Sequence, residues 1–167
     1  MHLFNVGDRV VYPMHGAGVI ESIEEREVLG KTGRYYIMRM PVGDIKVMVP
    51  IEQTGAVGLR EVVDAEGVHK ILDILFDEGT QETAAWNRRY RDNMDKIKSG
   101  DAFAIADVVR QLAWLDRHKG LSTGEKRMYE MARQILLSEL RLAAPQEDAD
   151  RLEELTARLG GNRRTGC

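Results

Sequence analysis

The chain has 167 residues, of which 43% are hydrophobic and 31% are charged, a composition typical of a folded protein rather than a disordered one. It contains no apolar run near the roughly 18 residues that span a membrane, so we expect no membrane partner. The first residues show no secretory pattern, and the one cysteine, Cys167, is the last residue. Both features favour a reducing, cytoplasmic setting.

The net charge of −3 is distributed unevenly along the chain. Residues 61–83 carry one Lys or Arg against seven Asp or Glu, whereas residues 84–133 carry 11 against seven. This basic excess weakly indicates an anionic partner for residues 84–133. A solvated helical surface would explain the same charges.

Short β-rich segments separated by turn-forming residues occupy residues 1–60. Segments 34–40 (RYYIMRM) and 45–50 (IKVMVP) alternate between two faces, as half-buried strands do. The connection LGKTG at residues 29–33 is typical of a hairpin. Several short strands joined by tight turns predict a small open barrel of the SH3 or Tudor type. In the first segment Tyr36, Met38 and Met40 are expected on one face and Tyr35, Ile37 and Arg39 on the other, and in the second segment Ile45, Val47 and Val49 point one way and Lys46 and Met48 the other.

From about residue 66 the apolar residues recur with the period of a helix. One helix has a strong start signal, because Ser122 is followed three residues later by Glu125, the pattern of a capping box. The expected helices cover about 66–76, 83–98, 101–118, a segment that follows Ser122 and reaches Leu140, and a short helix within 147–159.

The change of period predicts an α+β chain of two domains. A Tudor-like or SH3-like β-barrel is expected at residues 1–60 and a connector at 61–65. An all-α bundle of four to five helices is expected at 66–159. The remaining residues, 160–167, are expected to form a disordered tail.

The sequence contains only weak matches to nucleotide-binding, metal-binding or catalytic motifs. The letters GKT at residues 30–32 resemble the end of a phosphate-binding loop, but Glu25 stands where that motif needs a glycine. The four histidines lack the spacing of metal ligands. We therefore expect no catalytic residue, no metal, no cofactor and no enzymatic activity. The histidines are His2, His15, His69 and His118.

Trp86 stands just before three arginines, Arg88, Arg89 and Arg91, at the start of a predicted helix with Thr83 as its N-cap. Two interpretations are open. Trp86 begins an apolar helical stripe, which favours a core anchor. A side chain in the first turn can also overhang the edge of a bundle, where the helix N-terminus and the arginines suit phosphate. The stripe consists of Trp86, Tyr90, Asn93 and Ile97.

Trp114 raises a similar question in the helix expected at 101–118. With Phe103, it lies opposite the main apolar stripe of that helix. We expect a central helix that is buried on two faces.

Four stretches resemble the CarD/CdnL family of bacterial transcription regulators, in the order in which that family has them. The resemblance extends from about residue 3 to residue 143, and the first 60 residues also resemble the polymerase-interacting domain of transcription-repair coupling factor. The four stretches are 6–24, 47–62, 86–101 and 120–140.

The resemblance implies that the N-terminal domain docks on the β subunit of RNA polymerase by pairing an exposed strand with a strand of that subunit. It places a basic contact at Arg26. Some relatives carry a basic residue where this chain has Met48, so apolar packing is expected to replace that contact. The docking strand implied by the resemblance consists of Ile45, Lys46, Val47, Met48, Val49 and Pro50.

The resemblance also implies that the helical domain lies on promoter DNA at the upstream edge of the transcription bubble. Trp86 matches the family's wedge residue, and Arg88, Arg89 and Arg91 match its contacts to the backbone beside the minor groove. The expected function is stabilisation of the open promoter complex by a monomer held near the nucleoid through RNA polymerase. The alternative is an adaptor whose helical domain binds another polypeptide and not DNA.

Overall fold

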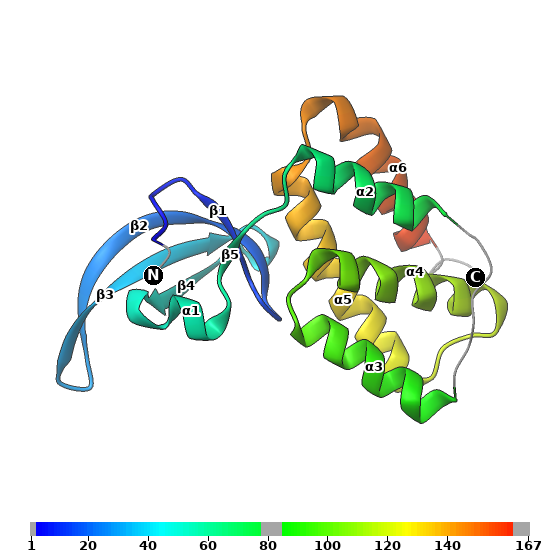
Figure 1. Ribbon diagram of the computed structural model, residues 1–167, viewed down its shortest axis with the longest axis horizontal. Helices are drawn as coiled ribbons and strands as arrows, with labels where there is room; N and C mark the ends of the chain where they lie inside the picture. The colour runs from blue at the N-terminus through cyan, green and yellow to red at the C-terminus, as the bar shows by residue number, and fades with distance from the viewer. Residues whose placement is uncertain (1–2, 78–84, 162–167) are drawn as a thin grey trace.

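Two groups of elements lie side by side in the computed structural model, a curved β-sheet and a bundle of helices (Figure 1). The structure describes residues 3–77 and 85–161. Within these residues, no helix has both the length and the apolar character needed to cross a membrane. The predicted α+β class with a β domain before a helical domain is confirmed.

The β domain contains a single antiparallel sheet with the strand order β4-β3-β2-β1-β5. Short helical segments, which the sequence pattern did not indicate, connect β3 to β4 and β4 to β5. The strands are β1 (Arg9–Tyr12), β2 (Gly16–Val28), β3 (Lys31–Met40), β4 (Ile45–Pro50) and β5 (Arg60–Glu61), and the short segments are η1 (Val42–Asp44), η2 (Ile51–Gln53) and α1 (Thr54–Val57).

The predicted apolar face of β3 forms the core of this domain, because Tyr36, Met38 and Met40 are all buried. The Tyr36 hydroxyl accepts a hydrogen bond from the backbone N–H of Phe4 at 2.8 Å, so the buried phenol has a partner. Ile37 is buried as well, although it was expected on the opposite face with the more exposed Tyr35 and Arg39.

A long hairpin made by β2 and β3 extends away from the helices (Figure 1). The pairing shifts register between Ile20 and Ser22, and such a bulge bends a strand and increases its twist. The hairpin predicted at LGKTG is confirmed. Leu29 and Gly30 both have positive φ angles, of 53° and 78°, as in the tight turns that suit twisted hairpins.

The five helices of the bundle follow the predicted periodicity. They are α2 (Ala65–Phe76), α3 (Trp86–Lys98), α4 (Ala102–His118), α5 (Thr123–Ala143) and α6 (Ala149–Gly161), with η3 (Gln146–Asp148) before α6. Several limits differ from the predicted ones by one to three residues, and two of the differences concern a predicted cap and the predicted tail. The N-cap of α3 is Ala85, while the predicted cap Thr83 lies outside the described residues. Helix α6 includes Gly160 and Gly161, which the sequence assigned to the tail, and residues 162–167 lie outside the description.

Helix α4 lies at the centre of the bundle and buries its main stripe, including Val108 and Leu112. Its opposite side is covered only in part. Trp114 is half-buried against the core and stacks on His118 with ring centroids 4.4 Å apart. Phe103 is 38% exposed, so the expected burial on two faces is reached at Trp114 and not at Phe103.

The two domains are joined by the carboxylate of Glu139, which is 2% exposed on α5. Arg60 of β5 donates two hydrogen bonds of 2.8 Å to it, and the backbone N–H of Val63 donates a third at 2.9 Å. Arg60 also donates to the Gly100 carbonyl at 2.9 and 2.8 Å. One ion pair therefore links β5, the connector, the α3–α4 turn and α5.

A second contact between the domains lies beside the first. The Ser138 hydroxyl on α5 accepts a hydrogen bond from the backbone N–H of Ala17 on β2 at 2.9 Å. Gly16 allows this approach, because a Cβ atom there would lie 2.9 Å from the Ser138 oxygen, and its φ angle of 104° favours glycine. The contact places β2 directly against α5 (Figure 1).

We predict that Glu139→Ala lowers the free energy of unfolding by about 3 kcal/mol, because it leaves the Arg60 guanidinium without its buried partner. Urea unfolding followed by circular dichroism measures this loss. Arg39→Ala is the matched control, since its ion pair with Asp44 is exposed and should contribute no more than about 1 kcal/mol. Equal losses for the two variants would show that Glu139 does not hold the domains together.

Candidate polymerase and nucleic-acid interfaces

Strand β4 is an edge strand of the sheet and pairs on one side with β3. Val49 is 1% exposed and Val47 packs partly on the core, as the alternation predicted. Ile45 is 56% exposed, although it shares their side of the strand, and Met48 is 41% exposed on the other side. An edge strand offers backbone N–H and C=O groups to a partner strand.

Charged side chains lie beside this edge. Lys46 of β4 pairs with Glu21 of β2, with its nitrogen 3.1 Å from the carboxylate. Arg26 lies further along the hairpin, opposite Gly33 of β3, so β3 separates it from β4. The structure thus places Arg26 in the same sheet as the predicted docking strand, beyond its Pro50 end, and not next to it.

Arg26 is exposed but is held by a neighbour on its own strand. Its Nε donates to Glu24 Oε1 at 3.0 Å. Hydrogen bonds from Arg26 and then from Ser22 lower the pKa of Glu24 below its ordinary value. Glu24 therefore stays ionised at neutral pH and orients the guanidinium of Arg26 on the outside of the hairpin.

Trp86 is the first residue of α3 and is 44% exposed. Further along the same stripe, Tyr90 is partly buried, and Asn93 and Ile97 are buried. Burial thus increases along the stripe from Trp86 to Ile97. Each of the two interpretations, core anchor and overhanging side chain, is therefore correct for one end of the stripe. The stripe anchors α3 in the core, and Trp86 is the end of it that overhangs.

Among the described residues, the Trp86 ring contacts Tyr90 and Ser122. It stacks on Tyr90 with ring centroids 5.2 Å apart, and its Nε1 donates a hydrogen bond to Ser122 Oγ at 3.1 Å. Because this N–H is the only polar group of an indole, the part of the ring that faces solvent is hydrocarbon. Such a surface suits insertion between bases better than hydrogen bonding to them.

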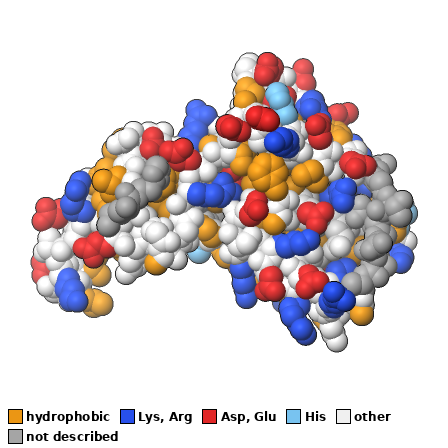
Figure 2. Space-filling model, viewed as in Figure 1, with side chains coloured by type: hydrophobic (Ala, Val, Ile, Leu, Met, Phe, Trp, Pro, Cys, Tyr) orange, Lys and Arg blue, Asp and Glu red, His pale blue; other side chains and the backbone are white. Residues whose placement is uncertain are grey.

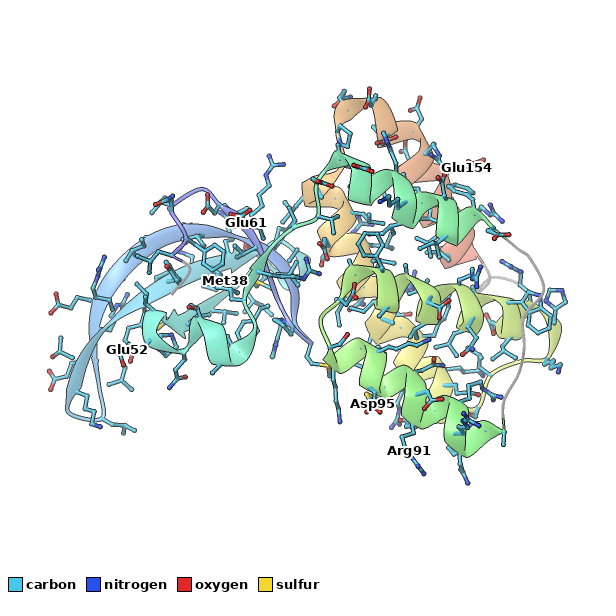
Figure 3. All side chains as sticks on the ribbon, viewed as in Figure 1. Met38, Glu52, Glu61, Arg91, Asp95 and Glu154 are labelled. Carbon is cyan, nitrogen blue, oxygen red and sulfur yellow. The ribbon has the colours of Figure 1, made fainter. Side chains whose placement is uncertain are left out.

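The three arginines of α3 have different surroundings. Arg88 is exposed, with its Nε 3.8 Å from Asp92, and Arg91 is exposed and projects away from the bundle (Figure 3). Arg89 is largely buried instead and donates to Glu125 through Nε at 2.8 Å and through a terminal nitrogen at 3.2 Å. Arg88 and Arg91 are thus exposed on the helix that carries Trp86, at roughly 140–160° round the helix axis from it, whereas Arg89 has an internal partner.

The predicted capping box at Ser122 and Glu125 is confirmed in one of its two halves. The Glu125 backbone N–H donates to Ser122 Oγ at 3.2 Å. The Glu125 carboxylate is taken up by Arg89. Burial acts to raise the pKa of Glu125, but hydrogen bonds and charge attraction from Arg89, together with Ser122, outweigh it and lower that pKa. The sequence signalled the cap but not the contact of Ser122 with Trp86.

Lysine and arginine side chains gather along the lower edge of the helical domain, over α3, with acidic side chains among them (Figure 2). The acidic neighbours include Asp92 and Asp95, and Asp95 lies on the same helix as Arg91 (Figure 3). The field of this face is therefore only moderately positive, in agreement with the small basic excess of residues 84–133.

A group of potential metal ligands lies elsewhere, between α2 and η3. His69 Nε2 is 2.7 Å from Asp148 Oδ2 and 3.9 Å from Glu147 Oε1. The shorter distance is a close contact between the imidazole and the carboxylate, and acidic groups of this kind are common without a metal, so we assign no ion to them.

Both domains match known sequence families. Residues 4–63 match the family described as CarD-like/TRCF RID domain, and residues 70–156 match the family described as CarD, C-terminal domain. The "Putative transcription factor YdeB" of Bacillus subtilis (strain 168) is 39% identical over 138 residues, which cover 83% of this chain and 90% of that protein.

A solved structure is also similar to part of this chain. The solution NMR structure of the 72-residue N-terminal domain of Myxococcus xanthus CarD is 38% identical and covers 35% of this chain and 77% of its own, with a TM-score of 0.31. The two family matches and the relative from Bacillus subtilis carry the conclusion. The chain belongs to the CarD/CdnL family of bacterial transcription regulators, which are not enzymes.

Proposed function

We propose that this protein binds the β subunit of RNA polymerase through β4 and promoter DNA through the Trp86 end of α3, and that it stabilises the open complex. The observation that carries the proposal is the position of Trp86. A half-exposed apolar ring at the first turn of a helix, with Arg88 and Arg91 exposed in the first two turns of the same helix, combines a wedge with phosphate contacts.

The edge position of β4 supports docking by strand addition. Its unpaired side can accept a strand of the polymerase, and exposed Met48 supplies apolar contact where a basic residue stands in some relatives. Arg26 extends the docking surface along the hairpin. Docking of this kind depends on backbone groups, so it tolerates the change at Met48.

The two contacts reinforce one another. Since the DNA-facing side is only moderately positive, its affinity for free DNA should be low. Docking on the polymerase raises the local concentration of promoter DNA, so that a few phosphate contacts suffice. We assign these contacts to Arg88 and Arg91 and give Arg89 a structural role, because its guanidinium is engaged by Glu125.

The wedge acts by discriminating between open and closed DNA. Inserting a ring between base steps costs a few kcal/mol in intact duplex, and much of this cost is absent at the edge of a bubble. Trp86 therefore binds open DNA better than closed DNA, and only such a difference shifts the equilibrium. The resemblance to the family assigns this contact to the upstream edge of the bubble, where intact duplex lies within reach of the arginines.

The exposed part of the ring limits the size of the effect. A tryptophan buries about 150–250 Å² in total, and about half of that area is still available here. At roughly 25 cal/mol per Å² the ceiling is about 2–3 kcal/mol, from which ordering costs are subtracted. A net gain of about 1 kcal/mol corresponds to about a fivefold longer lifetime of the open complex.

Docking is tested with proline in the edge strand. Alternate N–H groups of β4 point outward, so either Lys46→Pro or Val47→Pro removes a donor that a partner strand needs. That variant should bind a fragment of the polymerase β subunit about tenfold more weakly in a pull-down or titration. Lys46→Ala, which keeps the N–H, is the control. If both proline variants are folded by circular dichroism and bind like wild type, docking by strand addition is wrong.

The phosphate contact is tested by reversing one charge. Arg88→Glu should shorten the open-complex lifetime about three- to tenfold on any promoter, because phosphate carries no base identity, and added salt should reduce the difference. Arg141→Glu makes the same charge change in the last turn of α5, at the opposite end from Ser122, and should have little effect. A variant that loses binding to the β subunit and keeps its promoter effect would contradict the assignment of the two domains.

The wedge is tested with Trp86→Ala. We expect about a fivefold shorter open-complex lifetime and a loss of folding free energy of about 1–2 kcal/mol, from one hydrogen bond and partial burial. A fully buried aromatic residue would cost about 3–5 kcal/mol instead. Promoter-complex lifetimes and thermal unfolding are measured together. A large loss of stability with an unchanged lifetime at matched folded concentration would identify Trp86 as a core anchor only.

A further inference from the structure

The indole of Trp86 is attached to a chain of hydrogen bonds that crosses from α3 to α5. Its Nε1 donates to the hydroxyl of Ser122, which is the N-cap of α5. The cap of α3 itself is Ala85, which offers no side-chain hydrogen bond. Within the described residues, the start of α3 is therefore fastened to the start of α5, and its N-cap residue adds no side-chain hydrogen bond.

The Ser122 hydroxyl has no freedom left to change its orientation. It accepts from Trp86 Nε1 and from the Glu125 N–H, and it lies 3.3 Å from Glu125 Oε1, to which it donates. A hydroxyl has one proton and two lone pairs. All three are used, and one lone pair is directed at the indole.

The next member of the chain is itself buried and paired. Glu125 is 2% exposed and receives two hydrogen bonds from the planar guanidinium of Arg89, whose side chain is 13% exposed. Two parallel hydrogen bonds of this kind hold both planes in one orientation. Arg89 lies three residues after Trp86, so the chain of contacts returns to the first turns of the helix that carries the ring.

We infer that Ser122, Glu125 and Arg89 are positioning residues that hold the Trp86 ring in one orientation before any partner binds. The significance of this orientation for DNA depends on the proposed function, whereas the orientation itself is a property of the free protein. This role explains why Arg89, a basic residue close to Trp86 in the chain, is paired inside the protein. Its charge holds Glu125, and Glu125 holds the hydroxyl that receives the indole.

Preorganisation of this kind lowers the cost of binding. A free tryptophan side chain loses rotamer entropy when it is immobilised at an interface, and a ring that is already oriented avoids that loss. The orientation also leaves only hydrocarbon exposed, because the polar edge of the indole is bound to Ser122. Release of the ring should therefore shorten the open-complex lifetime by about two- to tenfold.

The test uses the full-length chain with Trp114→Phe, which leaves Trp86 as the single tryptophan of the two in the sequence. In this background Ser122→Ala removes the acceptor, and Ser122→Thr keeps a hydroxyl and a capping residue. Fluorescence anisotropy and the NMR signal of the indole N–H proton report whether the Trp86 ring is held in one orientation in the free protein. The lifetime of the open complex is then measured with RNA polymerase holoenzyme on a promoter fragment.

Loss of a helix cap is a structural effect that needs its own control. Asp101 is the N-cap of α4 and accepts from the Phe103 N–H at 2.9 Å, so Asp101→Ala removes a cap without a contact to Trp86. We expect lower anisotropy, a shifted indole signal and a shorter lifetime for Ser122→Ala, with wild-type values for Asp101→Ala and for Ser122→Thr. Arg89→Lys, which keeps the charge and loses the planar pair, should have the same direction of effect as Ser122→Ala.

Two results would overturn the inference. One is a Ser122→Ala variant whose indole signal and anisotropy equal those of the Trp114→Phe background. The other is a freed ring with an unchanged or longer open-complex lifetime, although Trp86→Ala shortens it. If Trp86→Ala leaves the lifetime unchanged, the proposed function fails, and the measurements on the free protein still decide whether the three residues orient the ring.

Discussion

The buried carboxylate of Glu139 is the interaction on which the arrangement of the molecule depends. A charge with 2% exposure is stable only when hydrogen bonds replace its water, and these come from Arg60 and the Val63 backbone in the other half of the chain. The carboxylate therefore specifies how the β domain sits on α5. A different docking of the domains would leave this charge unpaired, which is more costly than the loss of an apolar contact.

A fixed joint matters because the proposed function needs two contacts at once. Strand β4 belongs to the sheet, and Trp86 belongs to α3, which reaches the joint through the Gly100 carbonyl bound by Arg60. A loose linker would spread the position of Trp86 over a large volume and lower its effective concentration at the DNA. The joint keeps the edge strand and the wedge in one geometry, so binding at one determines the position of the other.

The three arginines that follow Trp86 on α3 have different surroundings. Arg88 and Arg91 point to solvent, where a charge attracts phosphate at little cost in folding. Arg89 is the next residue along α3 and faces the start of α5. There it pairs with Glu125, whose pKa is lowered because its hydrogen bonds and the charge of Arg89 outweigh the effect of burial. The same residue type thus provides surface charge and internal order within one turn of helix.

Local patterns were sufficient for much of this structure. Alternation grouped Tyr36, Met38 and Met40 on one face of β3, which the structure buries, and the capping signal located Ser122 correctly, because both patterns depend on neighbours in the chain. The resemblance of four stretches was sufficient to identify the family. By contrast, the burial of Ile37 and the start of α3 at Trp86 depend on what packs against them, which no local period records.

By itself, the sequence determined the two kinds of domain and the family, and it supplied the candidate residues for the proposed interfaces. The tertiary structure alone decided that Trp86 is a half-exposed end of a buried stripe and that Arg89 faces inward. It also joined Trp86 to Ser122 across 36 positions and Arg60 to Glu139 across 79. The physical reason is that burial and ion pairing depend on distance in space, and residues so far apart in the chain meet only after the helices and the sheet have packed.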